Sequence, residues 1–180
     1  MRLPLLLTRL NLGLVLLATA MHGVMMLLNE IIGPHMQYLP GIGWIYLPAG
    51  TRLLCTLLFG APGALGLLLS SWIACYWYYF PGDLLRATMG ALAGAVGPLL
   101  AYLVAQRRFG LHVNLVNLTP QALLACAVGC ALASSLLHLA WFTVHGDANL
   151  LDGFLVMFAG DLSGTMLILY AARALLPRRA

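Results

Sequence analysis

The chain has 180 residues, of which 62% are apolar and only 8% are charged. Soluble domains carry about 25% charged residues, so the charges of this chain are too few to cover a water-soluble fold. About six helices of ~20 apolar residues each would use most of the chain to cross a bilayer. The composition excludes a soluble globular protein and predicts a single integral membrane domain over residues 1–180: an all-α, polytopic membrane helix bundle.

The net charge of +4 comes from arginines alone, because the chain contains no lysine. In a membrane chain the position of positive charges matters more than their sum, so we expect no nucleic-acid partner. The first apolar run extends from about Leu10 to Ile32, beyond the about 7 to 15 residues of a signal-peptide core, and is expected to remain as an anchor. The cysteines lie in apolar stretches and are expected to be free packing residues: Cys55, Cys75, Cys126 and Cys130.

Apolar runs between polar and helix-breaking residues predict spans near residues 10–32, 45–60, 62–80, 87–106, 120–144 and 150–176. The second span is short and contains Arg52, and Pro48 suits its first turn, which suggests that this helix begins inside the membrane. The preceding stretch from Gly33 to Tyr46 is rich in Pro and Gly, so we expect it to lie at the outer surface or to dip back into the bundle. Thr119 followed by Pro120 is typical of a capped helix start.

Positively charged flanks are retained in the cytoplasm during insertion. With these spans only Arg86 flanks one side, whereas the other side carries Arg2, Arg9, Arg107, Arg108, Arg173, Arg178 and Arg179. We therefore expect both termini to be cytoplasmic. The aromatic residues gather at the outer ends of the spans, as in an interfacial belt, and such a one-sided belt can also wall an outward-facing cavity.

Four ionisable residues fall inside predicted spans: His22, Arg52, His138 and Asp161. At a rise of ~1.5 Å per residue they lie about 10 to 17 Å from the outer ends of their helices, so they can share one depth. Each costs roughly 2.5 to 3.5 kcal/mol in hydrocarbon and needs a partner or a purpose. Arg52 and Asp161 are predicted either to form a structural ion pair or to line a ligand site, where Arg52 meets an anion or Asp161 takes a proton or cation.

The two histidines are expected to be hydrogen-bonded core residues or to contact a ligand or proton. Imidazoles on facing helices can also hold a haem or a metal, but nothing else in the sequence supports such a site, so no metal and no cofactor are expected. Ser163 lies between glycines, but it lacks the spacing of an intramembrane serine protease and no histidine follows it. No nucleophile and base can be assigned, and the chain is predicted not to be an enzyme.

Small residues recur at helical spacing on two predicted spans. Gly90, Gly94 and Gly97 form a face of the GxxxG type, and Ala125, Gly129 and Ala133 repeat the spacing. Such faces allow another helix backbone to approach closely. They are expected to pack the two spans together, with contact to a partner protein or a second copy of the chain as the alternative.

Two motifs have a counterpart in a known family. The first is Tyr46-Leu47-Pro48-Ala49-Gly50, followed by Arg52, an apolar run and Phe59-Gly60, and the second is Phe158-Ala159-Gly160-Asp161-Leu162-Ser163-Gly164. Together they resemble the membrane-associated sensor (MASE-type) domains of bacteria. The matching positions are Pro48, Gly50, Arg52, Gly160, Asp161 and Gly164.

The resemblance implies a sensor module for signal transduction in the bacterial inner membrane. The family has about eight helices and feeds a cyclase, phosphodiesterase or histidine kinase, whereas about six helices are expected here. A separate protein partner would then supply the output. Two alternatives remain: the substrate-binding subunit of an energy-coupling-factor transporter, although His22 stands where the usual Ala-x-x-x-Ala surface would follow Ala18, and a structural subunit of a membrane complex.

Overall fold

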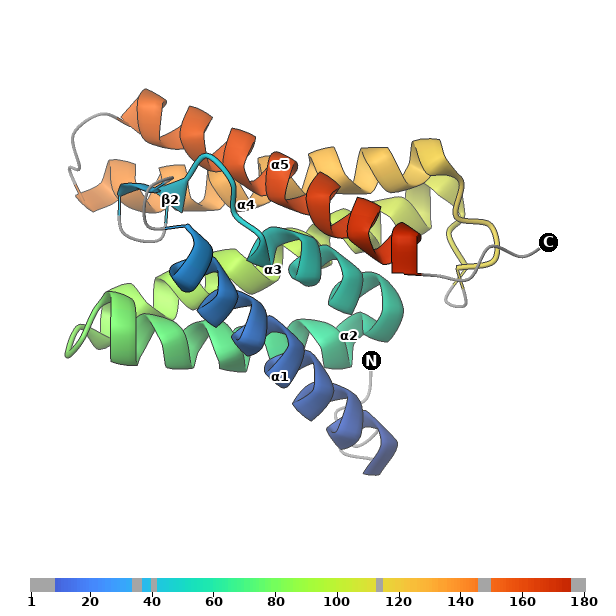
Figure 1. The fold of residues 1–180 in the computed structure, drawn as a ribbon, viewed down its shortest axis with the longest axis horizontal. Coiled ribbons are helices and arrows are strands. Elements are labelled where there is room, and N and C mark those ends of the chain that lie inside the picture. The colour runs from blue at the N-terminus through green and yellow to red at the C-terminus, as the bar shows by residue number, and fades with distance from the viewer. Residues whose placement is uncertain (1–8, 34–36, 40–41, 113–114, 146–149, 176–180) are drawn as a thin grey trace.

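The computed structural model describes residues 9–33, 37–39, 42–112, 115–145 and 150–175, and it consists almost entirely of helices (Figure 1). The elements are α1 (Arg9–Ile32), β1 (Gln37–Leu39), β2 (Ile42–Gly43), α2 (Pro48–Ala74), the π-helical turn η3 (Cys75–Tyr79), α3 (Leu84–Phe109), α4 (Pro120–His145) and α5 (Leu150–Leu175). The all-α prediction is confirmed, apart from one short antiparallel hairpin of β1 and β2. Within these ranges, 5 helices are long and apolar enough to cross a membrane.

The predicted count of six spans is not confirmed, because the spans expected at 45–60 and 62–80 form one element, α2 with η3. This element is not straight, since Gly60 adopts a φ of 59° and a ψ of -130° inside it. Arg52 before Gly60 and Ser70 after it both hydrogen-bond to His22, although they would lie ~27 Å apart on a straight helix. The two limbs of α2 therefore run side by side. Glycine supplies the positive φ that this reversal needs.

The chain between β2 and α2 packs against the glycines of α5. The Tyr46 amide donates to the Gly160 carbonyl at 3.0 Å, and Ser163 Oγ donates to the Trp44 carbonyl at 2.8 Å. A Cβ at Gly160 or Gly164 would collide with the carbonyl oxygen of Gly43 or of Tyr46, respectively. Gly160 lies about ten residues, or ~15 Å, along α5 from its start. Irregular backbone at that depth is tolerated because the surrounding protein satisfies its polar groups.

The connections between helices alternate between two ends of the bundle. The first turn of α1, the reversal at Gly60, the α3–α4 connection and the last turn of α5 lie at one end (Figure 1). The β-hairpin, the turn at Pro81–Gly82 and the start of α5 lie at the other. Arg107 and Arg108 at the end of α3 belong to the first group, and Arg86 at the start of α3 belongs to the second.

Packing between α2, α3 and α4 forms the main apolar core, which includes Leu53, Leu57, Tyr102, Cys126 and Cys130. The four cysteines are free and buried, as the sequence predicted. Thr119 Oγ1 accepts the Ala122 amide at 3.2 Å, which confirms the predicted capped start of α4. Pro48 begins α2 as expected.

Replacing Gly160 by alanine tests the packing of the Trp44–Leu47 backbone on α5. A Cβ at Gly160 would collide with the Gly43 carbonyl, and the adjacent Trp44 and Tyr46 are hydrogen-bonded to α5. Gly160→Ala should therefore lower the free energy of unfolding by about 1 to 3 kcal/mol or more. Gly13→Ala on α1 is the matched control, because no atom lies within 4 Å of its Cβ position, and it should be neutral or slightly stabilising. Thermal unfolding in mild detergent measures both, and equal stability of the two variants would contradict the close packing.

Candidate functional site

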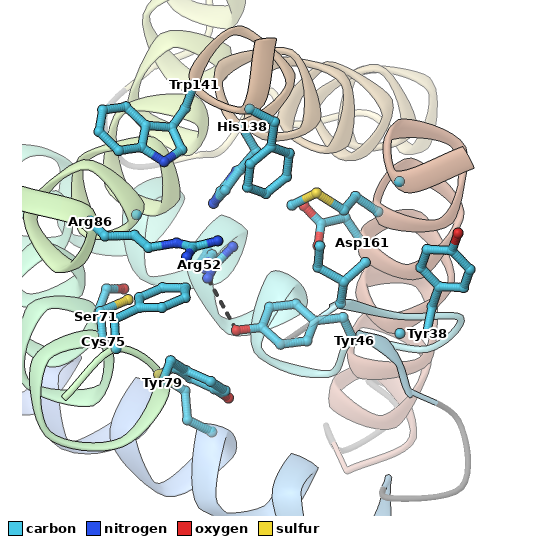
Figure 2. Close-up of a pocket in the computed structure, with 18 of the residues that line it drawn as sticks. Tyr38, Tyr46, Arg52, Ser71, Cys75, Tyr79, Arg86, His138, Trp141 and Asp161 are labelled. Carbon is cyan, nitrogen blue, oxygen red and sulfur yellow. Dashed lines mark hydrogen bonds between the residues drawn. The ribbon is translucent and has the colours of Figure 1, made fainter. Parts of the chain in front are cut away.

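A cavity of about 570 Å³ opens at the end of the bundle that carries the β-hairpin (Figure 2). Its volume falls within the roughly 300 to 1,000 Å³ typical of small-molecule sites. All five long helices contribute side chains, together with the hairpin and η3. The lining combines aromatic residues and methionines with a small number of charged and hydroxyl groups, which is the usual composition of a pocket that both buries and orients a ligand.

Arg52 is the buried cation of this cavity, with 7% of its surface exposed. Its Nη2 donates to the Tyr46 hydroxyl at 3.2 Å, and its guanidinium carbon lies 5.0 Å from the centre of the Tyr46 ring. Its Nε donates to His22 Nε2 at 3.3 Å. Both partners are therefore neutral acceptors, and neither cancels the charge.

His22 lies behind Arg52 and does not line the cavity. It is fully buried, and its Nδ1 lies 2.8 Å from Ser70 Oγ. Because Nε2 accepts from Arg52, the proton of the neutral ring is assigned to Nδ1, which then donates to Ser70. Ser70 Oγ in turn donates to backbone carbonyls of its own helix, at Gly66 or Leu67. This chain of hydrogen bonds holds Arg52 in place by linking α1 to both limbs of α2.

Asp161 and His138 line the opposite side of the cavity. Asp161 on α5 is 5% exposed, and Figure 2 shows it across the open centre from Arg52. The guanidinium of Arg52 contacts Tyr46 and His22 rather than this carboxylate. His138 on α4 donates from Nδ1 to the Ser134 carbonyl at 2.9 Å, which leaves Nε2 as an acceptor on a ring that points into the cavity.

The four ionisable residues singled out from the sequence thus lie in one region of the bundle. Arg52, His138 and Asp161 line the cavity, and His22 supports Arg52 from behind. Arg52 and Asp161 share the cavity without the direct ion pair that one interpretation of the sequence expected. Both charged side chains line the same cavity.

The remaining motif residues have packing positions around this site. Gly94 faces Arg52, where a Cβ would lie 3.2 Å from Nη2, and Gly90 lines the cavity. Gly97, the third glycine of the GxxxG face, packs against α4. A Cβ at Gly97 would lie 2.9 Å from the backbone nitrogen of Ser134. A Cβ at Gly50 would collide with Ile168 of α5. The two segments that carry the family resemblance therefore contact each other, since Pro48 and Gly50 begin the helix whose entry packs on Gly160 and Gly164.

The sequence did not indicate every residue of the site. Arg86 is expected from the sequence only as a charge that flanks a span, and nothing in the sequence singles out Ser71, yet both line the cavity. Arg86 packs its guanidinium carbon 4.8 Å above the centre of the Phe80 ring at the mouth. Tyr46, Tyr79, Trp141 and Phe142 also line the cavity, in agreement with the alternative interpretation of the one-sided aromatic belt as a cavity wall.

A metal or haem site at the two histidines is not favoured by this geometry. Nε2 of His22 accepts a hydrogen bond from Arg52, and Nδ1 of His138 is engaged by a backbone carbonyl. Within the described residues, no group of three or more His, Cys, Asp or Glu side chains is placed to hold a metal ion.

No protein-family model, curated protein or solved structure matches this chain. The case for a function therefore rests on the geometry of the cavity and on the residues that line it.

Removing the hydroxyl of Tyr46 tests how Arg52 is held. Tyr46→Phe keeps the ring above the guanidinium but deletes the charge-assisted hydrogen bond, and should lower the free energy of unfolding by about 1.5 to 3 kcal/mol. Tyr102→Phe is the matched control, because Tyr102 is similarly buried and its hydroxyl accepts from the neutral Gln106 amide. That variant should lose only about 0.5 to 1.5 kcal/mol. Equal losses in chemical unfolding would show that Tyr46 does not hold a buried cation.

Proposed function

We propose that this protein is a membrane receptor that binds a small molecule in the cavity and passes the resulting change in helix packing to a separate protein. The observation that carries the proposal is the cavity itself, which is lined by every long helix and by two buried, oppositely charged side chains that do not neutralise each other directly. Ionisable groups inside a membrane bundle commonly mark the path or site of a ligand.

Several helices meet at the cavity, so a ligand bound there can change how these helices pack. A ligand between Arg52, His138 and Asp161 contacts α2, α4 and α5 at once. It shifts the equilibrium between two packings by its difference in affinity for them. The opposite end of the bundle, with Arg107 and Arg108, is the surface at which a partner protein reads the change. This role corresponds to the sensor function that the MASE-type resemblance implies.

We further propose that the chain crosses a bacterial inner membrane six times with both termini in the cytoplasm. The first limb of α2 comprises about 12 residues, or ~18 Å, and is too short to span the ~30 Å hydrocarbon core by itself. The Trp44–Leu47 backbone, which dips into the bundle along α5, adds to its length. This backbone and the first limb together make one crossing, and the second limb of α2 makes another. The arginine-rich end of the bundle then faces the cytoplasm, and the cavity opens on the outer side.

Reporter fusions distinguish six crossings from five. Fusions after Gly33 and after Gly82 should report the same, periplasmic side, because α2 enters and leaves between them. A fusion after Gly110 should report the cytoplasm and serves as the control. A straight α2 would instead place Gly33 and Gly82 on opposite sides, and that result would contradict the proposed topology.

Filling the cavity tests ligand binding. Gly153 lines the cavity and no atom lies within 4 Å of its Cβ position, so Gly153→Leu places a large side chain in the cavity without a backbone clash. Gly13→Leu adds the same side chain to α1 at an equally open position away from the cavity. Native mass spectrometry of protein in nanodiscs should show a bound small molecule in the wild type and in Gly13→Leu, with at least about a tenfold lower occupancy in Gly153→Leu.

A small molecule retained equally by both variants would contradict binding in the cavity. Purification of the wild type in mild detergent should also recover the partner protein. A signalling enzyme supports the sensor role, whereas an ATP-binding cassette pair would favour the transporter alternative.

A further inference from the structure

We propose that the cavity recognises the oxyanion of an amphipathic ligand, a carboxylate or a phosphate, between the guanidinium groups of Arg52 and Arg86. This inference rests on the proposed function, because it names the chemistry of the ligand that the cavity binds. Four features of the described residues carry it.

The first feature is the charge balance of the lining. Among the described residues that line the cavity, two are arginines and one, Asp161, is a carboxylate. Arg52 contacts the neutral His22 and Tyr46, and Arg86 packs on the ring of Phe80. A cation that is buried in a membrane bundle and hydrogen-bonds only to neutral groups retains a cost of desolvation. A bound anion would offset this cost.

The second feature is the position of Arg86. It lies in the first turn of α3, where a positive charge is opposed by the helix dipole, and its backbone amide rather than its side chain contacts the capping Asp83. Figure 2 shows its guanidinium directed into the part of the cavity that holds Arg52. Two like charges directed at one region repel each other unless an anion lies between them.

The third feature is a hydroxyl without a partner. Ser71 lines the cavity and is 2% exposed, and its Oγ makes no hydrogen bond to any described residue. It lies close to Arg52, since a Cβ at Gly94 would meet Nη2 of Arg52 at 3.2 Å and Oγ of Ser71 at 3.5 Å. A guanidinium with an adjacent hydroxyl donor matches the acceptor oxygens of a carboxylate or phosphate.

The fourth feature is the rest of the lining, which fits an apolar body attached to the anion. Tyr46, Tyr79, Trp141 and Phe142 supply aromatic faces, and Met26 and Met157 supply flexible apolar contacts. The oxyanion can belong to a soluble aromatic acid or to the headgroup of an anionic lipid. Both sources share the chemistry that the two arginines recognise.

Titration of phenyl phosphate and phenylacetate into the protein in phosphatidylcholine nanodiscs tests the proposal, with benzyl alcohol as the neutral probe. Calorimetry should detect the anions and give at least about tenfold weaker binding of benzyl alcohol. Arg86→Gln should weaken anion binding by about tenfold or more, because it removes a charge-assisted hydrogen bond. Arg52→Gln should do the same, and Ser71→Ala should weaken binding by a smaller factor. Arg108→Gln, an exposed arginine at the other end of α3, should change nothing.

A second arm separates the two sources of the oxyanion. Native mass spectrometry in nanodiscs that contain phosphatidylglycerol should show retained lipid, lost in Arg86→Gln, if the headgroup is the ligand. Binding of the aryl anions without lipid retention supports a soluble acid, and either result supports the oxyanion site.

Benzyl alcohol binding as tightly as the anions, or anion binding that is unchanged in Arg86→Gln, would overturn the proposal. Because Arg86 is exposed, its substitution should leave the fold intact even where Arg52→Gln does not. A neutral molecule that co-purifies with the wild type and is displaced by Gly153→Leu, without anion binding, would leave the proposed receptor function standing and remove only this inference.

Discussion

The reversal of α2 at Gly60 is the constraint on which the rest of the structure depends. It brings Arg52 on the first limb beside Ser70 and Ser71 on the second, so that one histidine on α1 contacts both limbs. Without it, these groups would lie ~27 Å apart along one helix. The cavity would then lose its buried cation, and Ser71 would have no guanidinium beside it.

Close packing by glycine is what allows the first limb to start deep in the bundle. The Trp44–Leu47 backbone has no helix of its own, so its polar groups need partners from the surrounding elements. Gly160 accepts the amide of Tyr46, Asn29 accepts the amide of Leu47, and the absence of a Cβ on α5 permits the approach. The same contact positions Tyr46, which then supplies its hydroxyl to Arg52.

The two buried charges of the cavity, Arg52 and Asp161, are not arranged as a structural ion pair. A buried pair in direct contact would fix the packing of α2 on α5 but would leave little capacity for a ligand. Here the guanidinium of Arg52 is oriented by neutral acceptors, and the carboxylate of Asp161 lies across the cavity. Neutral hydrogen-bond partners orient the guanidinium without cancelling its positive charge. Aromatic side chains line the cavity around it, and electrostatic interactions are stronger in such surroundings than in bulk water.

The sequence by itself determined the class of the protein and most helix boundaries. Its apolar runs predicted α1, α3, α4 and α5 to within about three residues, because each run must cover the thickness of a bilayer. It also identified Arg52, His138 and Asp161, because charges inside apolar runs are costly and therefore conspicuous. The predicted break between the spans 45–60 and 62–80 also coincides with the reversal at Gly60. Only the tertiary structure decided that Arg52 is held by Tyr46 and His22 rather than by Asp161, and that Arg86 and Ser71 belong to the same cavity. These features depend on which helix faces meet, and hydropathy records how apolar a segment is without recording which neighbour it packs against.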